Sequence, residues 1–317
     1  MEAMSQPMYV NLHTHSDYSL LDGLAKVDQL VGRAKELGMP ALALTDHGVM
    51  YGAIDLYKAC KKAEIKPIIG VEAYMAPRTR FDKVPKIDSK YFHLTLLARN
   101  NQGYANLIEL VTAGWMEGFY YRPRIDHDLL SQKCEGLIIL TGCIGGEVGQ
   151  AIVNGEPEEA EKIIAWYEEL VGKEHVFVEI QHHPGLEDQV KVTATLKALA
   201  KKNGWQLVAT CDSHYVKHED KDAHEILLAV QSKSTDEDKR WSLKEIDLHL
   251  RTPEEMAEAF VDTPEALTNT LKVAELCDVS ITFGENKLPE FPSTRGISNM
   301  DELRLLCGEG FTRRYGP

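Results

Sequence analysis

The segment ALALTDHG, residues 41–48, joins a short apolar run to an end that carries a carboxylate, Asp46, and an imidazole, His47. We expect a strand over residues 41–45, because the run is short and apolar and a turn signal follows at Gly48. The two polar side chains then lie just beyond the carboxyl end of that strand. In sheets of parallel strands, this is the end where functional groups gather.

Similar short runs recur and alternate with segments of helical periodicity. Apolar residues spaced by three and four positions over residues 27–37 form one helical face, which ends at Gly38. We expect further helices over residues 157–171, 190–202 and 253–260, the last opened by a capping box at Thr252. The expected strands are residues 8–12, 41–45, 67–74, 92–98, 137–141, 176–181 and 207–210. This alternation predicts a mostly parallel sheet, and seven strands favour a barrel over a sandwich.

Composition limits the classes of function. The chain of 317 residues has a formal net charge of -14, which argues against a broad basic surface for nucleic acid. A nucleic acid would then be handled at a local site neutralised by metal, or through a surface of a partner. The sequence shows neither a membrane-length apolar run nor a signal-peptide pattern. Six cysteines without a C-x-x-C pair predict reduced thiols, so we expect a bacterial, cytoplasmic location without membrane association.

Other expected strands also end in side chains that bind metals. His13 and His15 lie two residues apart at the end of the first strand, so both imidazoles leave the same face. Glu72 ends the third strand, and Asp212 and His214 follow the last with the same spacing. Taken singly, a carboxylate here is an ordinary helix N-cap and a histidine is an ordinary surface group. Taken together, and with the first segment, they predict a metal site at the mouth of a barrel.

The ligand types suggest the ions and the chemistry. Imidazoles and carboxylates suit Zn, Mn or Fe, and a set this large exceeds what one ion coordinates, so we expect two to three divalent ions. Clustered divalent ions activate water and hold a phosphate during in-line displacement, which makes phosphoester hydrolysis the expected reaction. The rival is a cysteine nucleophile at Cys143, in the turn TGCIGG; as a further alternative this cysteine is simply a small buried apolar residue.

With these residues in place, the chain resembles the polymerase and histidinol phosphatase (PHP) family. It is most similar to the branch that forms the N-terminal domain of bacterial replicative DNA polymerase alpha subunits. The similarity rests on six motifs spread between residue 8 and about residue 290. They are LHTHSDYSLLDG (12–23), EIKPIIGVEAY (64–74), YFHLTLLARN (91–100), GFYYRPRID (118–126), TGCIGGEV (141–148) and CDSHYV (211–216).

The resemblance implies a fold and a ligand set. The implied fold is a distorted seven-stranded (β/α) barrel with the metal site at the C-terminal mouth of its strands. The resemblance implies that the residues matched by motif bind the metal ions and that the ions hold the catalytic water. For the carboxylate that follows the first strand, it favours Asp22 over Asp17. The matched residues are His13, His15, Asp22, His47, Glu72, His93, Cys143, Asp212 and His214.

His93 poses a question of topology, because it stands at the start of its expected strand. If residues 92–98 run antiparallel to the Glu72 strand, after the long loop 78–90, the His93 imidazole returns to the same mouth. The sequence therefore predicts one antiparallel strand in the barrel and a short distance between Glu72 and His93.

Several further residues have a functional and an ordinary interpretation. Asp46 is expected to orient a metal-binding imidazole. Arg122 and Arg124 either grip a phosphate or belong to a loop packed by neighbouring tyrosines. His182 and His183 either contact substrate or form a solvated pair at a strand end.

The resemblance also implies a division of the chain and a role. We expect a PHP domain over residues 1–284, and over residues 285–317 a linker and helix leading toward a polymerase palm domain beyond this sequence. The expected activity is metal-dependent 3′-5′ proofreading at a DNA primer end, in cis to the DNA-directed polymerase and near other replisome subunits. The alternatives are a silent module stabilised by its metals and a phosphomonoesterase for small molecules.

Overall fold

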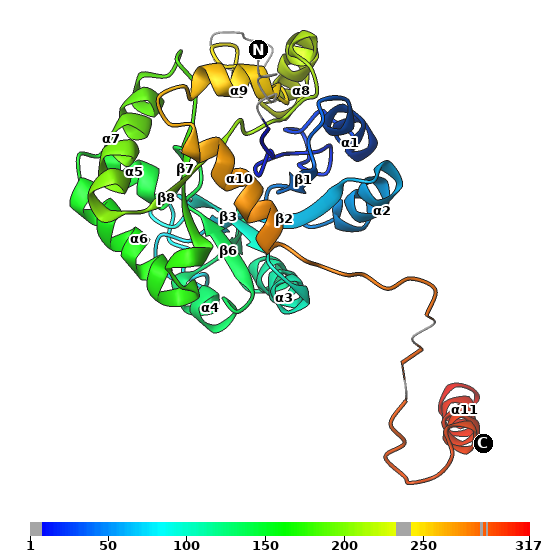
Figure 1. Cartoon of the computed structure of the whole chain (residues 1–317). Coiled ribbons are helices and arrows are strands. Elements are labelled where there is room, and N and C mark those ends of the chain that lie inside the picture. The colour runs from blue at the N-terminus through cyan, green and yellow to red at the C-terminus, as the bar shows by residue number, and fades with distance from the viewer. Residues whose placement is uncertain (1–7, 233–241, 286–287, 290) are drawn as a thin grey trace. The chain divides into compact units, whose positions relative to one another are not determined.

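The computed structural model of the chain describes residues 8–232, 242–285, 288–289 and 291–317. The chain divides into two compact units, Met1–Ser280 and Ile281–Pro317. The larger unit contains the sheet and most helices, and Figure 1 shows these helices surrounding the strands. The predicted boundary at residues 284 and 285 stays a prediction.

The sheet of the larger unit has eight strands in the described residues. Its order is β4-β5-β2-β3-β6-β7-β8, and β1 pairs with the first half of β2. The strands are β1 (Ala41–Leu44), β2 (Lys66–Met75), β3 (Phe92–Ala98), β4 (Phe119–Tyr120), β5 (Arg122–Ile125), β6 (Leu137–Leu140), β7 (Val176–Gln181) and β8 (Gln206–Thr210). This curled, mixed sheet with helices outside it is the distorted (β/α) barrel that the sequence predicts.

The first of the seven predicted strands is not formed. Residues 8–12 have no regular strand; instead, the segment from Asn11 to His15 bridges β1 and the residues that follow β8. The backbone N–H groups of Ala43 and Thr45 donate to the carbonyl oxygens of Asn11 and Thr14, at 3.1 and 2.9 Å, and His15 N–H donates to the carbonyl of Ser213 at 2.8 Å. Side chains replace part of the ladder, since Thr14 N–H donates to Thr45 Oγ1 and Asn11 Nδ2 donates to Thr14 Oγ1. These local bonds compete with a regular strand.

β3 runs antiparallel to β2, as predicted from His93. Tyr74 pairs with His93 in this register, which brings the start of β3 to the carboxyl end of β2. β6 is antiparallel to β3 and then parallel to β7, and β7 is parallel to β8. The reversal of β3 therefore brings His93 to the mouth where the other functional strand ends lie.

The helices of the larger unit begin and end close to the predicted signals. Thr252 accepts a hydrogen bond from Glu255 N–H and caps α9, and Gly38, at a φ of 70°, follows α1. The α-helices are α1 (Val27–Glu36), α2 (Ala53–Ala63), α3 (Asn101–Met116), α4 (His127–Gln132), α5 (Glu147–Val153), α6 (Pro157–Val171), α7 (Glu187–Asn203), α8 (Lys221–Ser232), α9 (Pro253–Ala259) and α10 (Glu265–Leu276). Two 3-10 turns are also present: η1 (Lys173–His175) lies between α6 and β7, and η2 (His218–Asp220) lies between β8 and α8.

The apolar core fills the end of the barrel opposite the polar strand ends. It combines residues from the first halves of the parallel strands, such as Ala41, Ile68 and Val208, with Leu97 from the last half of β3. Val273 of α10 joins the same cluster, and α10 lies across the strands in Figure 1. This end is packed with apolar side chains, whereas the functional strand ends lie at the other mouth.

The smaller unit holds α11 (Asn299–Tyr315), which Ser298 caps by accepting a hydrogen bond from Asp301 N–H. The described residues between 281 and 298 form no helix or strand, as expected for a linker; residues 286–287 and 290 of the predicted linker lie outside the description. None of the described helices combines the length and apolarity needed to cross a membrane.

Candidate metal centre

The carboxyl ends of the strands bring the nine predicted ligands to one place. They come from the bridging segment, the turn after it, the ends of β1, β2, β6 and β8, and the start of β3. They are His13, His15, Asp22, His47, Glu72, His93, Cys143, Asp212 and His214, each within 4 Å of at least one other member.

Glu72 forms the centre of one half of the set and is almost completely buried. Its Oε2 lies 2.7 Å from His47 Nδ1, and its Oε1 lies 2.9 Å from His93 Nδ1 and 3.3 Å from His13 Nε2. The short approach to His93 confirms the predicted antiparallel return. These neighbouring histidines hold the pKa of Glu72 well below its usual value, although burial acts in the opposite direction.

Asp212 forms the centre of the other half. Its Oδ1 lies 3.4 Å from His13 Nε2, 3.3 Å from His15 Nε2 and 3.6 Å from His214 Nδ1. Asp212 has a φ of 46°, in the left-handed region that few residues other than glycine adopt. Such local strain is typical of a residue that the surrounding fold holds for function.

Asp22 closes the set from the turn after the bridging segment. Its Oδ2 lies 3.0 Å from His47 Nε2, and its Oδ1 lies 3.7 Å from His214 Nε2, whereas Asp17 is exposed. The turn requires glycine at Gly23, because a Cβ there would lie 1.9 Å from the carbonyl oxygen of Ser16. This close approach brings Asp22, and not Asp17, to the cluster.

Cys143 stands beside the Glu72 half, after β6. Its Sγ lies 3.5 Å from His93 Nδ1 and 3.7 Å from Glu72 Oε1. Burial raises the pKa of this thiol well above its usual value, and the carboxylates of Glu72 and Asp212 raise it further. A thiol with so high a pKa is a poor nucleophile, whereas a divalent cation would favour the thiolate.

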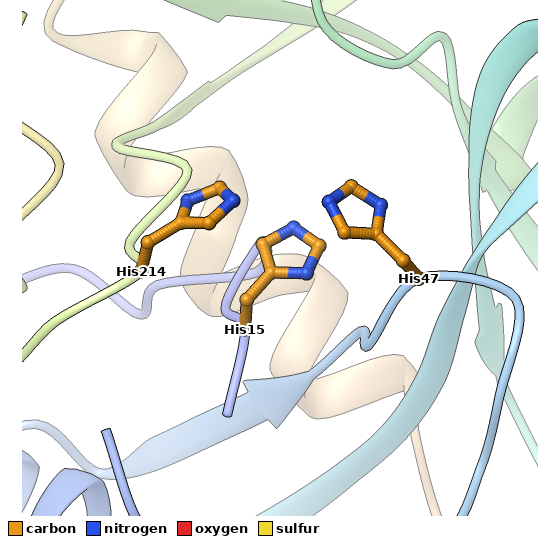
Figure 2. A group of neighbouring side chains, drawn as sticks. All are labelled: His15, His47 and His214. Atoms are coloured by element: carbon orange, nitrogen blue, oxygen red, sulfur yellow. The ribbon is translucent and has the colours of Figure 1, made fainter. Parts of the chain in front are cut away.

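Three histidines converge on the middle of the cluster, as Figure 2 shows for His15, His47 and His214. The His15 ring stacks on the His47 ring at 4.1 Å and on the His214 ring at 4.4 Å. Burial and these two neighbours lower the pKa of His15 to about 3. A neutral imidazole is the form that binds a metal.

Hydrogen bonds fix which ring nitrogen faces the centre. His13 Nδ1 lies 2.7 Å from the Glu179 carboxylate, and His214 Nδ1 lies 2.9 Å from the backbone carbonyl of Asp212, so both nitrogens donate. Ser19 gives its only hydroxyl proton to Asp46, so His15 Nδ1 must donate to Ser19 Oγ at 3.1 Å. In all three rings the lone pair of Nε2 is left for the centre.

The donor atoms fit divalent cations. Six buried ligand atoms lie close together but lack a partner with hydrogen-bond geometry; burying a polar group in this way is costly unless a ligand satisfies it. They are His13 Nε2, His15 Nε2, Asp22 Oδ1, His47 Nδ1, Glu72 Oε2 and Asp212 Oδ1. In three triplets, single ligand atoms all lie within 4.8 Å of one another: His15–His47–His214, His13–His15–Asp212 and His47–Glu72–His93.

Glu179 on β7 orients the cluster and was not recognised from sequence. Its carboxylate accepts from His13 Nδ1, and Oε1 also accepts from Thr210 Oγ1 at 2.5 Å and Gln181 Nε2 at 3.2 Å. An orienting carboxylate of this kind raises the basicity of a metal-binding imidazole. The signal in the sequence was a charged residue in the middle of the buried strand VFVEIQ.

Asp46 acts less directly than predicted. It accepts hydrogen bonds from Ser16 N–H at 2.7 Å and from the hydroxyl groups of Ser16 and Ser19, and no direct bond joins it to an imidazole among the described residues. Ser19 transmits its effect to His15, and also accepts from His47 N–H at 3.1 Å. Asp46 therefore orients the serine that orients the histidine.

The two arginines of the GFYYRPRID motif have different surroundings. Arg124 is completely buried and donates to the backbone carbonyls of Gly118, Asp88, Arg80 and Asp82, at 2.7–3.2 Å. The predicted phosphate contact is therefore wrong for Arg124, whose donors are used to fix the long loop before β3. Arg122 is half-buried and lies in a cavity that Asp22 and His47 also line.

His182 and His183 lie on another side of the mouth, in a cavity of about 530 Å³. His183 is buried, and burial lowers its pKa to about 4 although Asp212 opposes this effect. The prediction of a solvated pair is therefore wrong for His183, whereas substrate contact stays a prediction for both residues.

The family is shown by comparison with known proteins. The model of the PHP domain matches residues 11–183, more than half of the chain. The chain therefore belongs to the PHP domain family, as its barrel and ligand set already indicated.

The relatives identify the branch. The chain is 42% identical to the DNA polymerase III subunit alpha of Thermus aquaticus over 98% of its own length and 26% of that protein's. It is 43% identical to the same subunit of Deinococcus radiodurans over 97% of its own length and 24% of that protein's. The chain thus spans about a quarter of these curated relatives. A solved two-domain protein from Bacteroides vulgatus is 15% identical, with a TM-score of 0.40 over 65% of this chain and 52% of that one, a likeness too low to argue from.

Proposed function

We propose that this chain is a metal-dependent phosphodiesterase that removes nucleotides from the 3′ end of DNA, as the proofreading module of a replicative polymerase in the bacterial cytoplasm. The observation that carries the proposal is the convergence of six buried, unpartnered ligand atoms at one barrel mouth. Such a set has little structural use without cations, because its burial costs free energy.

The bound ions would be two to three of Zn, Mn or Fe, held by the nine residues of the cluster. Divalent ions in such a cluster lower the pKa of water and offset the negative charge of a phosphate. The chain's own residues would prepare this chemistry. Glu179, Ser19 and the Asp212 carbonyl hold three imidazoles in the tautomer that presents Nε2. Without a cation, nearby carboxylates raise the pKa of His13 although burial lowers it, so the cluster attracts positive charge.

The charge of the chain and the relatives support a proposal for the substrate and the partners. A chain with a net charge of -14 is poorly suited to bind long duplex DNA on its own surface. We therefore propose that further domains in cis, as in the longer alpha subunits, supply the DNA-directed polymerase and the basic surface for the primer. This module would receive only the 3′ end, next to other subunits of the replisome.

A nuclease assay on the metal-reconstituted chain tests this proposal. The substrates are a 3′-labelled primer with a matched end, the same primer with a mismatched end, bis-nitrophenyl phosphate and nitrophenyl phosphate. We expect stepwise release of 3′ nucleotides and hydrolysis of the diester, both lost in the His13→Ala, Asp212→Ala double variant.

Other outcomes identify the alternatives. Bound metal without hydrolysis, together with a lower melting temperature in the double variant, would mean that the metals stabilise a silent module. Rapid hydrolysis of the monoester alone would mean a small-molecule phosphatase. Either result would contradict the proposed exonuclease.

A further inference from the structure

An aromatic cavity of about 300 Å³ opens beside the metal centre. Asp22 and His47, both members of the ligand set, line it. The β4–β5 hairpin and the end of α3 also line it, through Trp115, Phe119 and Tyr121. A group bound in this cavity would lie next to the place where the phosphodiester reacts.

Four aromatic side chains of this cavity are exposed, whereas Tyr74, which also lines it, is buried. Tyr121 is 69% exposed, Tyr51 60%, Phe119 46% and Trp115 42%. Trp115 and Phe119 stack on one another at 5.4 Å, and Trp115 Nε1 donates to the Gly48 carbonyl at 3.0 Å. This bond ties the indole to the loop that carries His47, so the ring is fixed although it faces solvent.

The hairpin presents its aromatic residues at a backbone cost. Tyr121 has a φ of 62°, a left-handed conformation that is uncommon for a bulky residue. A glycine or asparagine would make the same turn with less strain. Strain of this kind is a feature of sites where a side chain must be presented in one direction.

The aromatic cavity also contains one cation, Arg122. The guanidinium of Arg122 lies 5.6 Å from the centre of the Tyr74 ring and 6.0 Å from that of Tyr91. Tyr74 in turn stacks on His47, with ring centres 5.8 Å apart. Arg122 therefore places a guanidinium in the same cavity as the metal ligands Asp22 and His47.

We propose that this cavity binds one unpaired nucleobase at the 3′ end of the substrate strand, while Arg122 binds a phosphate oxygen. Aromatic faces stack on bases of any sequence, and a guanidinium pairs with phosphate. This inference rests on the proposed function. It adds that the site selects a strand whose terminal base is unpaired. Because the cavity takes a base apart from its complement, a frayed or mismatched end enters more readily than a paired one.

The first experiment measures binding without turnover. Deoxyadenosine monophosphate and deoxyribose 5-phosphate are titrated separately into the full 317-residue chain with and without Mn²⁺, following tryptophan fluorescence. We expect the nucleotide to change the signal of Trp115 and the sugar phosphate to bind about 10-fold or more weakly. Trp115→Phe identifies the signal, Tyr121→Ala weakens nucleotide binding, and Phe81→Ala is the matched control, since Phe81 is 59% exposed but lies outside the cavity.

The second experiment measures selection during hydrolysis. Single-stranded oligonucleotides that end in a normal nucleotide or in a 3′ abasic residue are digested by the wild-type chain and by Tyr121→Ala. We expect the wild type to prefer the normal end about 10-fold and the variant to lose most of that preference.

The outcomes separate the cavity from the proposed function. Equal binding of nucleotide and sugar phosphate, or equal digestion of both ends, would overturn the base pocket and favour a docking surface for another polypeptide, while leaving hydrolysis intact. Selective binding of the nucleotide that depends on Tyr121, without hydrolysis, would support the base pocket and contradict the proposed exonuclease activity.

Discussion

Two buried polar clusters lie on this barrel, and they differ in whether their atoms have partners. Around Arg124, guanidinium donors meet four backbone carbonyls, and the cluster is complete within the chain. Around Glu72 and Asp212, six buried ligand atoms have no hydrogen-bond partner. A complete cluster fixes the fold, whereas an incomplete one with converging lone pairs indicates a ligand.

The largest expected effect follows from breaking the incomplete cluster. The His13→Ala, Asp212→Ala double variant removes donors from both halves of the set, so phosphodiester hydrolysis should fall more than about 1000-fold. Metal content after dialysis, measured by mass spectrometry, should fall with it, while circular dichroism shows a folded barrel. A variant that keeps its metal and its activity would show that the cluster does not take part in hydrolysis.

Breaking the complete cluster should cost stability and leave the chemistry. Arg124→Met leaves several buried carbonyls unpaired, so the free energy of unfolding should fall by about 3 kcal/mol. Denaturant titration measures this, with Arg122→Met as the matched control on the same strand. Equal losses in the two variants would show that Arg124 has no special structural role.

A smaller effect should follow at the carboxylate that joins the metal centre to the sheet. Glu179→Gln keeps the size of the side chain but removes the charge beside His13 Nδ1, so metal affinity should weaken by about 10- to 100-fold. Competition with a chelator measures this affinity, and Glu219→Gln, an exposed carboxylate, is the control. An unchanged affinity would make Glu179 a purely structural residue.

The smallest effect is expected at a polar pair that is only half-buried. A hydrogen bond from His127 Nε2 to Glu147, at 2.9 Å, raises the pKa of His127 above its usual value. This hydrogen bond therefore contributes fully to the free energy of unfolding below about pH 6.5, the usual pKa of histidine. The contribution is lost as the pH rises through the raised pKa of His127. Because about half of the His127 side chain is exposed to solvent, the change should be under about 1 kcal/mol. Unfolding titrations of wild type and His127→Gln across this range should differ only at the acidic end; parallel curves would contradict the assignment.

Much of the site could be predicted because a short apolar run followed by a polar residue marks a strand end within a few residues of sequence. His47 and Glu72 each follow or end a recognisable apolar run, and their strands bring them together. His93 could be placed only by assuming a reversed strand, and the 2.9 Å approach to Glu72 shows that this assumption was correct.

The remaining features depend on partners far away in the sequence. Arg124 looked like a phosphate ligand, but its carbonyl partners include Asp88, which is 36 positions away. Glu179 meets His13 across 166 positions. The irregular backbone of residues 8–12 depends on side-chain bonds of Asn11 and Thr14 that no hydrophobic pattern reports. Local periodicity predicts elements, whereas only packing decides which polar groups find partners.

We propose that divalent cations complete the incomplete cluster. Metal content per chain after reconstitution and removal of free ions, measured alongside cleavage of a 3′-labelled primer, is the measurement to make. We expect about two to three divalent ions per wild-type chain and 3′ trimming in proportion to metal content. A folded chain that binds less than one ion, or that trims the primer equally well after chelation, would contradict it.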